Sequence, residues 1–244
     1  MSFPSLCARD GDDALSDDEL VGEANGLFVA GYDTSAQTLM WTLFLLALHG
    51  DVLDEVHAEF DAVLGAGSAR RDPTAADVDR LVVLDRALKE SMRVLPAAPM
   101  LFMREVVQET RLGDVPLPPG ATVVLSTVVT HRDDGVFPEP RSFRPARFKD
   151  VDPPTYAYLP FGAGARMCLG AAFARQSLRL LLALILQRVR PVVVDGAVIS
   201  RRVRGIALGT KGALPMRLLP RAVAAPRTRA RVGGDIHDLV DLPR

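Results

Sequence analysis

Residues 161–170, with the sequence FGAGARMCLG, constrain this chain more than any other stretch. Three of the ten residues are glycines, which have no Cβ and let the backbone pass close to a flat group. An apolar run with helical spacing follows, so Cys168 is predicted to lie where a loop becomes a helix. The positive end of that helix and the nearby Arg166 favour a thiolate. Cys168 is therefore suited to bind a metal through sulfur.

Cys168 has three possible roles. A lone cysteine is most often a small buried apolar residue. A zinc site with four protein ligands is disfavoured, because no second cysteine or histidine lies nearby in the sequence. A single axial thiolate on a haem iron fits better, since the porphyrin supplies the other ligands.

The pattern Phe-x-x-Gly-x-Arg-x-Cys-x-Gly resembles the haem-binding signature of the cytochrome P450 family, the haem-thiolate monooxygenases. The resemblance implies that the cofactor is haem b (iron protoporphyrin IX) and that Cys168 is the metal ligand. The cofactor-binding residues that it implies in this loop are Phe161, Gly162, Arg166, Cys168 and Gly170.

Residues 30–35, AGYDTS, lie in the middle of a predicted helix although glycine, aspartate and hydroxyl residues are poor choices for a helix interior. Thr34 could donate a hydrogen bond to the carbonyl of Ala30 and bend the helix. The segment also resembles the family's oxygen-binding helix. That resemblance implies that Thr34 donates a hydrogen bond to dioxygen and that Asp33 relays protons, which makes them the candidate catalytic residues.

Glu90 and Arg93 are spaced i, i+3 on a further predicted helix. An exposed ion pair worth about 0.2–0.5 kcal/mol is the ordinary interpretation of this spacing. The motif also resembles the family's Glu-x-x-Arg, which forms a buried network with a later arginine. Arg147 in the segment Pro-Ala-Arg-Phe is that arginine, although Ala146 replaces the family's glutamate. All three residues are expected to be structural.

Two further residues have weaker assignments. The resemblance places Arg104 where many family members bind a haem propionate, and a solvated strand arginine is an equally good interpretation. It places His131 near the haem edge, although a lone histidine is more often structural.

The hydrophobic pattern predicts a mainly helical chain with a small β region. Ser16 to Glu19 form a capping box at the start of a first helix that ends near His49. Further helices are expected over residues 51–64, 81–95 and 168–189, and short strands over 96–125 and 192–219. The expected fold is cytochrome P450-like and truncated at the N-terminus. Residues 1–220 would be the C-terminal portion of that domain, and 221–244 a disordered basic tail.

Composition limits the partners and the compartment. The net charge of −1 in 244 residues gives no reason to expect a nucleic-acid partner. Two cysteines, Cys7 and Cys168, form no disulfide framework and fit a reducing compartment. The acidic start is unlike a signal peptide, and the longest apolar run is too short to cross a bilayer. A cytoplasmic protein without membrane contact is expected.

The resemblance implies insertion of one oxygen atom from dioxygen into a small organic substrate. Electrons would come from a ferredoxin or flavodoxin with its NAD(P)H reductase, because no flavin or iron–sulfur motif is present. Two alternatives stay open: a truncated, non-catalytic remnant that lacks the half covering the haem, and a haem-binding protein without turnover. Asp33 and Thr34 argue against the second, because a sensor needs no proton delivery.

Overall fold

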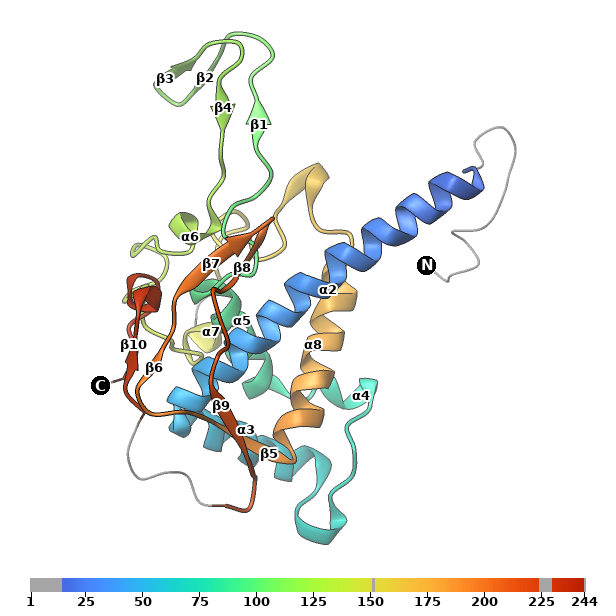
Figure 1. Ribbon diagram of the computed structural model, residues 1–244, viewed down its shortest axis with the longest axis vertical. Helices are drawn as coiled ribbons and strands as arrows, with labels where there is room; N and C mark the ends of the chain where they lie inside the picture. The colour runs from blue at the N-terminus through green and yellow to red at the C-terminus, as the bar shows by residue number, and fades with distance from the viewer. Residues whose placement is uncertain (1–14, 151, 224–229, 244) are drawn as a thin grey trace.

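The computed structural model describes residues 15–150, 152–223 and 230–243, so Cys7 lies outside the described residues (Figure 1). The helices are α2 (Asp17–Leu48), α3 (Gly50–Leu64), α4 (Ala75–Val78), α5 (Val82–Val94), α6 (Thr127–Thr130), α7 (Arg147–Asp150) and α8 (Ala171–Leu186), with 3-10 turns η2 (Gly67–Ala69), η3 (Gly164–Arg166) and η4 (Asp235–Asp238). The strands are β1 (Arg104–Glu105), β2 (Thr110–Leu112), β3 (Val115–Leu117), β4 (Thr122–Val123), β5 (Val189–Val193), β6 (Ala197–Val198), β7 (Arg201–Arg204), β8 (Ala207–Thr210), β9 (Met216–Pro220) and β10 (Val232–Gly233).

Helix α2 begins at the predicted capping box. The Ser16 hydroxyl accepts a hydrogen bond from the Glu19 amide, and the Glu19 carboxylate accepts one from the Ser16 amide. These bonds satisfy amide groups that a helix start leaves without partners. The Thr34 hydroxyl donates to the carbonyl of Ala30 at 2.7 Å, as expected. The helix nevertheless continues through this segment without a break.

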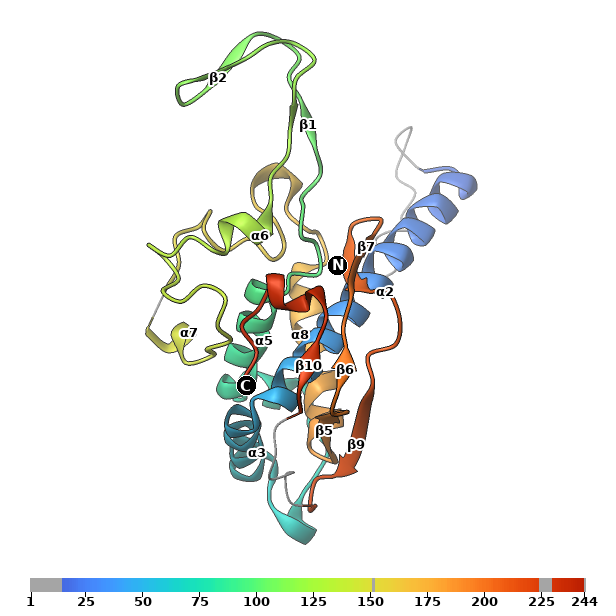
Figure 2. The same cartoon turned by 60° about the vertical axis from the view of Figure 1, so that its left-hand side comes forward.

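The hydrophobic core forms around the second half of α2, where Trp41, Phe44 and Leu45 are fully buried. Helices α3, α5 and α8 pack around this half. The first half of α2 is exposed and projects from the body in both views (Figures 1 and 2). Removing apolar surface from water is the main stabilising contribution to such a core. The second half of α2 is therefore the structural centre of the fold.

The strands form separate two-stranded ladders in place of one small sheet. Antiparallel pairs β1–β4 and β2–β3 make an arm that extends away from the helical body (Figures 1 and 2). Strands β5 and β9 pair beside α2, and β7 and β8 form a hairpin with Gly205 in the left-handed region at φ 58°. The indole N–H of Trp41 donates to the carbonyl of Leu208 at 2.8 Å, which fixes this hairpin to α2.

The described part of the C-terminal tail differs from the disordered segment that we expected. Over residues 230–243, strand β10 pairs in parallel with β6, and the side chains of Ile236 and Val240 are fully buried. Gly234, at φ 102°, lets the chain turn against the carbonyl of Ile199. The apolar side chains within this short segment order it by packing on the core. Residues 224–229 and 244 lie outside the described part.

No single helix among the described residues is long and apolar enough to cross a membrane. Helices α2 and α3 meet that criterion only as a pair, with a bend of 107° between them.

Candidate cofactor site

The loop of residues 161–170 places Cys168 on the surface just before α8. The Cys168 amide donates to the carbonyl of Phe161 at 2.8 Å, which closes the loop, and the Ala171 amide donates to the carbonyl of Cys168 at 3.3 Å. Gly162 and Gly164 have φ angles of 71° and 70°, in the left-handed region that favours glycine. The loop therefore has a fixed backbone while its cysteine thiol stays exposed.

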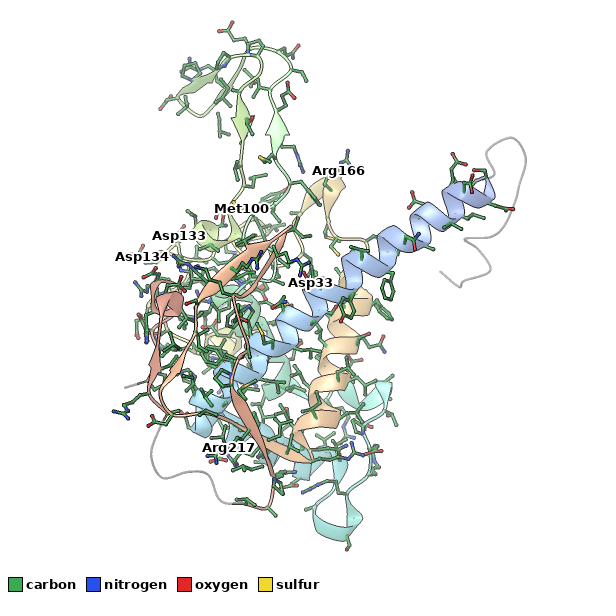
Figure 3. The ribbon with its side chains drawn as sticks, in the orientation of Figure 1. Asp33, Met100, Asp133, Asp134, Arg166 and Arg217 are labelled. Carbon is green, nitrogen blue, oxygen red and sulfur yellow. The ribbon has the colours of Figure 1, made fainter. Side chains whose placement is uncertain are left out.

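The other residues that the sequence assigned to this loop lie around Cys168. Phe161 is half-buried, and the guanidinium of Arg175 on α8 lies 5.9 Å from the centre of its ring. Arg166 projects from the outer tip of the loop (Figure 3). A Cβ built on Gly170 would lie 3.9 Å from the Cys168 sulfur. The helix start is at Gly170, two residues after Cys168.

The polar segment of α2 holds Asp33 and Thr34 where the exposed half of the helix meets the buried half. Gln37, one turn further along, donates from its Nε2 to the Asp33 Oδ1 at 3.2 Å and so orients that carboxylate. Figure 3 shows Asp33 on α2 and Arg166 at the loop tip. Helices α2 and α8 are in contact. Sequence reasoning missed Gln37, although its i+4 spacing from Asp33 was a usable signal.

Glu90, Arg93 and Arg147 are brought together in one buried network. Both Glu90 and Arg93 side chains are 0 % exposed, and the Arg93 Nε lies 2.8 Å from the Glu90 carboxylate. Arg147 Nε lies 3.2 Å from the same carboxylate. Arg93 also donates to the carbonyls of His131 (2.8 Å), Pro140 (2.7 Å) and Ser142 (3.1 Å). The exposed ion pair is therefore the wrong interpretation of this spacing.

The structure gives His131 a structural position. It is fully buried, and its Nε2 accepts a hydrogen bond from the Leu159 amide at 2.7 Å. The Nδ1 consequently carries the proton and donates to the carbonyl of Arg93 at 3.2 Å. Burial, followed by the charges of Arg93 and Arg132, lowers the pKa of His131 to about 4. His131 thus connects the buried network to the chain entering the cysteine loop, a link that the sequence alone did not show.

Arg104 lies in the arm, on the exposed strand β1. Its Nη1 donates to the carbonyls of Phe102 at 2.8 Å and of Met103 at 3.3 Å. Among the described contacts, Arg104 has no hydrogen bond to the cysteine loop or to α2.

The cysteine loop fits a haem by two observations. No described protein atom lies within 4 Å of a Cβ built on Gly164, so a flat group can approach the backbone there. Large apolar side chains that follow Cys168 in the sequence are exposed, with Leu169 at 87 % and Phe173 at 76 %. A porphyrin is an apolar disc that would cover such side chains. Among the described residues no group of three or more His, Cys, Asp or Glu side chains could hold a metal ion.

Comparison with known proteins shows the protein family of this chain. The family model for cytochrome P450 matches residues 5–213, which is most of the chain. The chain belongs to the cytochrome P450 family.

Particular relatives lie in several kingdoms. Cyclooctatin synthase of Streptomyces melanosporofaciens is 38 % identical over 211 residues, covering 84 % of this chain and 44 % of the relative. Steroid 17-alpha-hydroxylase/17,20 lyase of Rattus norvegicus is 34 % identical over 181 residues, covering 72 % of this chain and 35 % of the relative. The chain thus spans less than half the length of these curated relatives.

Solved structures confirm the fold. A cyanobacterial cytochrome P450 with retinoic acid bound superposes with a TM-score of 0.80 at 29 % identity, covering 88 % of this chain and 49 % of the other. A zebra fish cytochrome P450 with progesterone has a TM-score of 0.72 at 30 % identity, covering 88 % and 48 %. The mainly helical cytochrome P450 fold with a small β region is therefore the one that the sequence predicted.

Proposed function

We propose that this chain carries the haem-thiolate site of a monooxygenase that inserts one oxygen atom from dioxygen into a small organic substrate. The observation that supports it best is the exposed Cys168 on a closed, glycine-shaped loop at the start of α8. The reaction consumes one substrate, dioxygen, two electrons and two protons, and it yields the hydroxylated product and water.

Haem b is the proposed cofactor: the Cys168 sulfur would hold it, and Phe161, Gly162, Arg166 and Gly170 would form the surrounding loop. When bound, the haem supplies the activation of dioxygen. The hydrogen bond between the Cys168 amide and the Phe161 carbonyl fixes the backbone from which the thiol projects. The Arg175 guanidinium fixes the Phe161 ring beside it.

Asp33 and Thr34 would handle the protons of this reaction. The Thr34 hydroxyl hydrogen lies toward the Ala30 carbonyl, and rotation about the C–O bond would direct it to a bound substrate. Gln37 occupies the Asp33 Oδ1, which leaves the Oδ2 to carry a proton from solvent. The exposed first half of α2 keeps both residues within reach of water.

Electrons would come from a ferredoxin or flavodoxin with its NAD(P)H reductase. An apolar substrate is the best match for the exposed Phe102 and Met103 at the base of the arm. The retinoic acid and progesterone of the two solved structures are suitable first probes.

The experiment supplies the haem-loaded chain with reductase, ferredoxin, NAD(P)H and isotopically labelled dioxygen, and it measures label in the products of these probes. One labelled oxygen atom per product is expected. Asp33→Asn and Thr34→Val should reduce product while NAD(P)H consumption continues, whereas Thr38→Val, one turn further along α2, should leave the ratio unchanged. Bound haem without labelled product would support a haem-binding protein without turnover. Failure to bind haem would support a non-catalytic remnant.

A further inference from the structure

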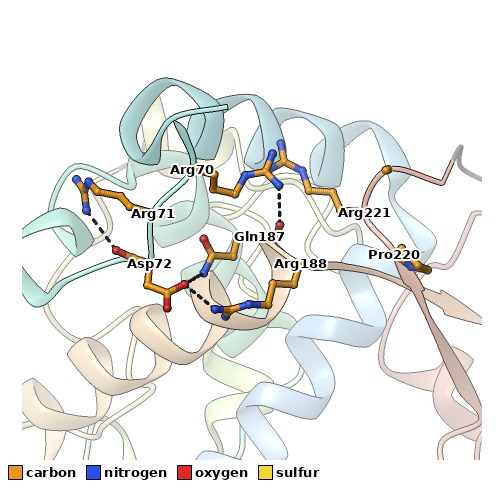
Figure 4. Close-up of a pocket in the computed structure, with 8 residues that line it drawn as sticks. Arg70, Arg71, Asp72, Gln187, Arg188, Pro220 and Arg221 are labelled. Atoms are coloured by element: carbon orange, nitrogen blue, oxygen red, sulfur yellow. Dashed lines mark hydrogen bonds and ion pairs between the residues drawn. The ribbon is translucent and has the colours of Figure 1, made fainter. Parts of the chain in front are cut away.

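A polar cavity lies far from Cys168, at the opposite end of α8. Its volume is about 380 Å³, and it is bounded by the loop after α3, the end of α8 and the end of β9 (Figure 4). Helix α8 has 16 residues, so this end lies about 24 Å along the helix from its start. The lining residues used below are Arg70, Arg71, Asp72, Gln187, Arg188 and Arg221.

The charges around the cavity do not balance. Arg71 makes a bidentate pair with Asp77 at 2.6 and 2.7 Å, and Arg188 binds Asp72 at 2.6 Å. The remaining lining arginines, Arg70 and Arg221, share the single carboxylate of Asp61 at 3.0 and 2.7 Å. Four guanidinium groups thus have three carboxylate partners, and one positive charge is in excess.

Gln187 fixes the kind of group that the cavity can bind. It is 1 % exposed, and its Nε2 donates to the Asp72 Oδ1 at 2.9 Å. Arg188 donates to the same oxygen, and a carboxylate only accepts, so the amide cannot be turned round. The Gln187 Oε1 is therefore directed elsewhere, buried and without a donor among the described residues.

Two donors next to it are also without partners. The Arg70 Nε and the Arg221 Nη1 are buried and have no acceptor among the residues that the structure describes. Figure 4 shows these two guanidinium groups beside one another, near Gln187. Buried polar atoms are nearly always hydrogen-bonded, and a buried polar atom without a hydrogen bond costs about 1–3 kcal/mol of stability. Two orphaned donors and one orphaned acceptor thus belong to residues that line one cationic cavity.

We propose that this cavity binds a phosphate anion that retains a P–OH group. Its charged oxygens accept hydrogen bonds from Arg70 and Arg221, and its hydroxyl donates to the Gln187 Oε1. Sulfate and carboxylates carry negative oxygens but have no such donor at neutral pH. The side chains of Asp72 and Arg188 at the rim are 63 % and 57 % exposed, so they can move to admit the anion.

A purely structural role explains only part of the cluster. Arg70 donates to the carbonyl of Gln187 at 3.3 Å, and Arg221 donates to the carbonyl of His57 at 2.7 Å. The first bond joins the loop after α3 to the end of α8, and the second joins the end of β9 to α3. They leave the Gln187 Oε1 and the two free guanidinium N–H groups unaccounted for.

The test is a thermal-unfolding titration of the purified chain with inorganic phosphate and with sulfate, at equal ionic strength and pH 7. Phosphate should raise the unfolding temperature in a saturable way, and sulfate should act at least about tenfold more weakly, as expected for the loss of one hydrogen bond of about 1.4 kcal/mol. Phosphorus NMR of the same solution gives a direct measure of bound phosphate that does not depend on unfolding.

Two variants and one control locate the effect. Arg70→Gln, which removes one of the two proposed phosphate donors, should weaken phosphate binding, and Gln187→Met should abolish the preference of phosphate over sulfate. Arg231→Gln removes an exposed arginine that pairs with Asp195 outside the cavity, and it should change neither. Equal responses to both anions, or an unchanged phosphate response in Arg70→Gln and Gln187→Met, would overturn the proposal. Absence of phosphate binding to the unmodified chain by NMR would also overturn it.

Discussion

Replacing Glu90 with glutamine should destabilise the fold strongly, because one buried carboxylate balances two buried guanidinium groups. Glu90 accepts hydrogen bonds from Arg93 at 2.8 and 2.9 Å, from Arg147 at 3.2 Å and from the Arg144 amide at 2.9 Å. Glutamine keeps the volume but removes the charge, and its amide N–H₂ faces donors. Phe137, 5.2 Å from the Arg93 guanidinium, does not replace the charge.

Removing one partner of a buried ion pair costs about 3–5 kcal/mol, since the other charge stays buried. A domain has about 5–15 kcal/mol of total stability, so this loss is a large fraction of it. The matched control is Asp85→Asn on the same helix, whose carboxylate lies 3.7 Å from Arg179 and pairs with Lys89 at 2.7 Å, the lysine being 37 % exposed. That pair should contribute less than about 1 kcal/mol.

The assay is urea unfolding of both variants, followed by circular dichroism. Glu90→Gln should lose at least about 2 kcal/mol more unfolding free energy than Asp85→Asn. If the two losses agree within about 0.5 kcal/mol, the buried network does not have the energetic role described here.

Two further predictions concern stability. Burial is the main reason that the pKa of His57 and that of His131 are lowered to about 4 in the folded chain. The ordinary pKa of a histidine side chain is 6.5. Between pH 6.5 and 4 the unfolded chain therefore binds more protons than the folded chain. Urea unfolding should show the unfolding free energy falling from pH 6.5 toward 4 by about 1.4 kcal/mol per pH unit for each histidine, with no histidine contribution above about pH 7. A flat profile between pH 6.5 and 5 would contradict this prediction. Gly234→Ala places a Cβ 2.3 Å from the Ile199 carbonyl oxygen, whereas Gly196→Ala meets no atom within 4 Å. Both glycines have positive φ, so backbone strain acts on both variants and the clash acts on Gly234→Ala alone. Thermal unfolding should therefore show a loss of unfolding free energy that is larger by about 2 kcal/mol for Gly234→Ala, and equal losses would refute the close approach.

The sequence predicted the parts of the fold that local patterns determine. The capping box at Ser16 and the apolar periodicity defined α2, α3, α5 and α8 to within a few residues, because capping and burial of one face act over short distances. It missed the order of residues 230–243, whose few apolar side chains have no local period strong enough to detect. Packing of Ile236 against the core decides that segment.

In the candidate site, too, local patterns could be predicted from the sequence and long-range contacts could not. Residues of one motif, such as Glu90 and Arg93, could be grouped from their spacing. The position of His131 could not, because its partners Arg93 and Leu159 are 38 and 28 residues away and only the folded chain shows them. The arginine cavity at the end of α8 likewise depends on tertiary contacts, whereas the Gln37–Asp33 bond is local to α2 and could have been found from its i, i+4 spacing. Long-range polar contacts are thus the part that sequence patterns do not encode.

The central claim is that Cys168 holds a haem through its sulfur, and a single absorption spectrum tests it. The purified chain is loaded with haem, reduced and exposed to carbon monoxide, with Cys168→Ala treated alongside. A Soret band shifted strongly to the red in the unmodified chain and absent in Cys168→Ala is the expected result. A band typical of a neutral ligand, or identical spectra for the two proteins, would contradict a thiolate site at Cys168.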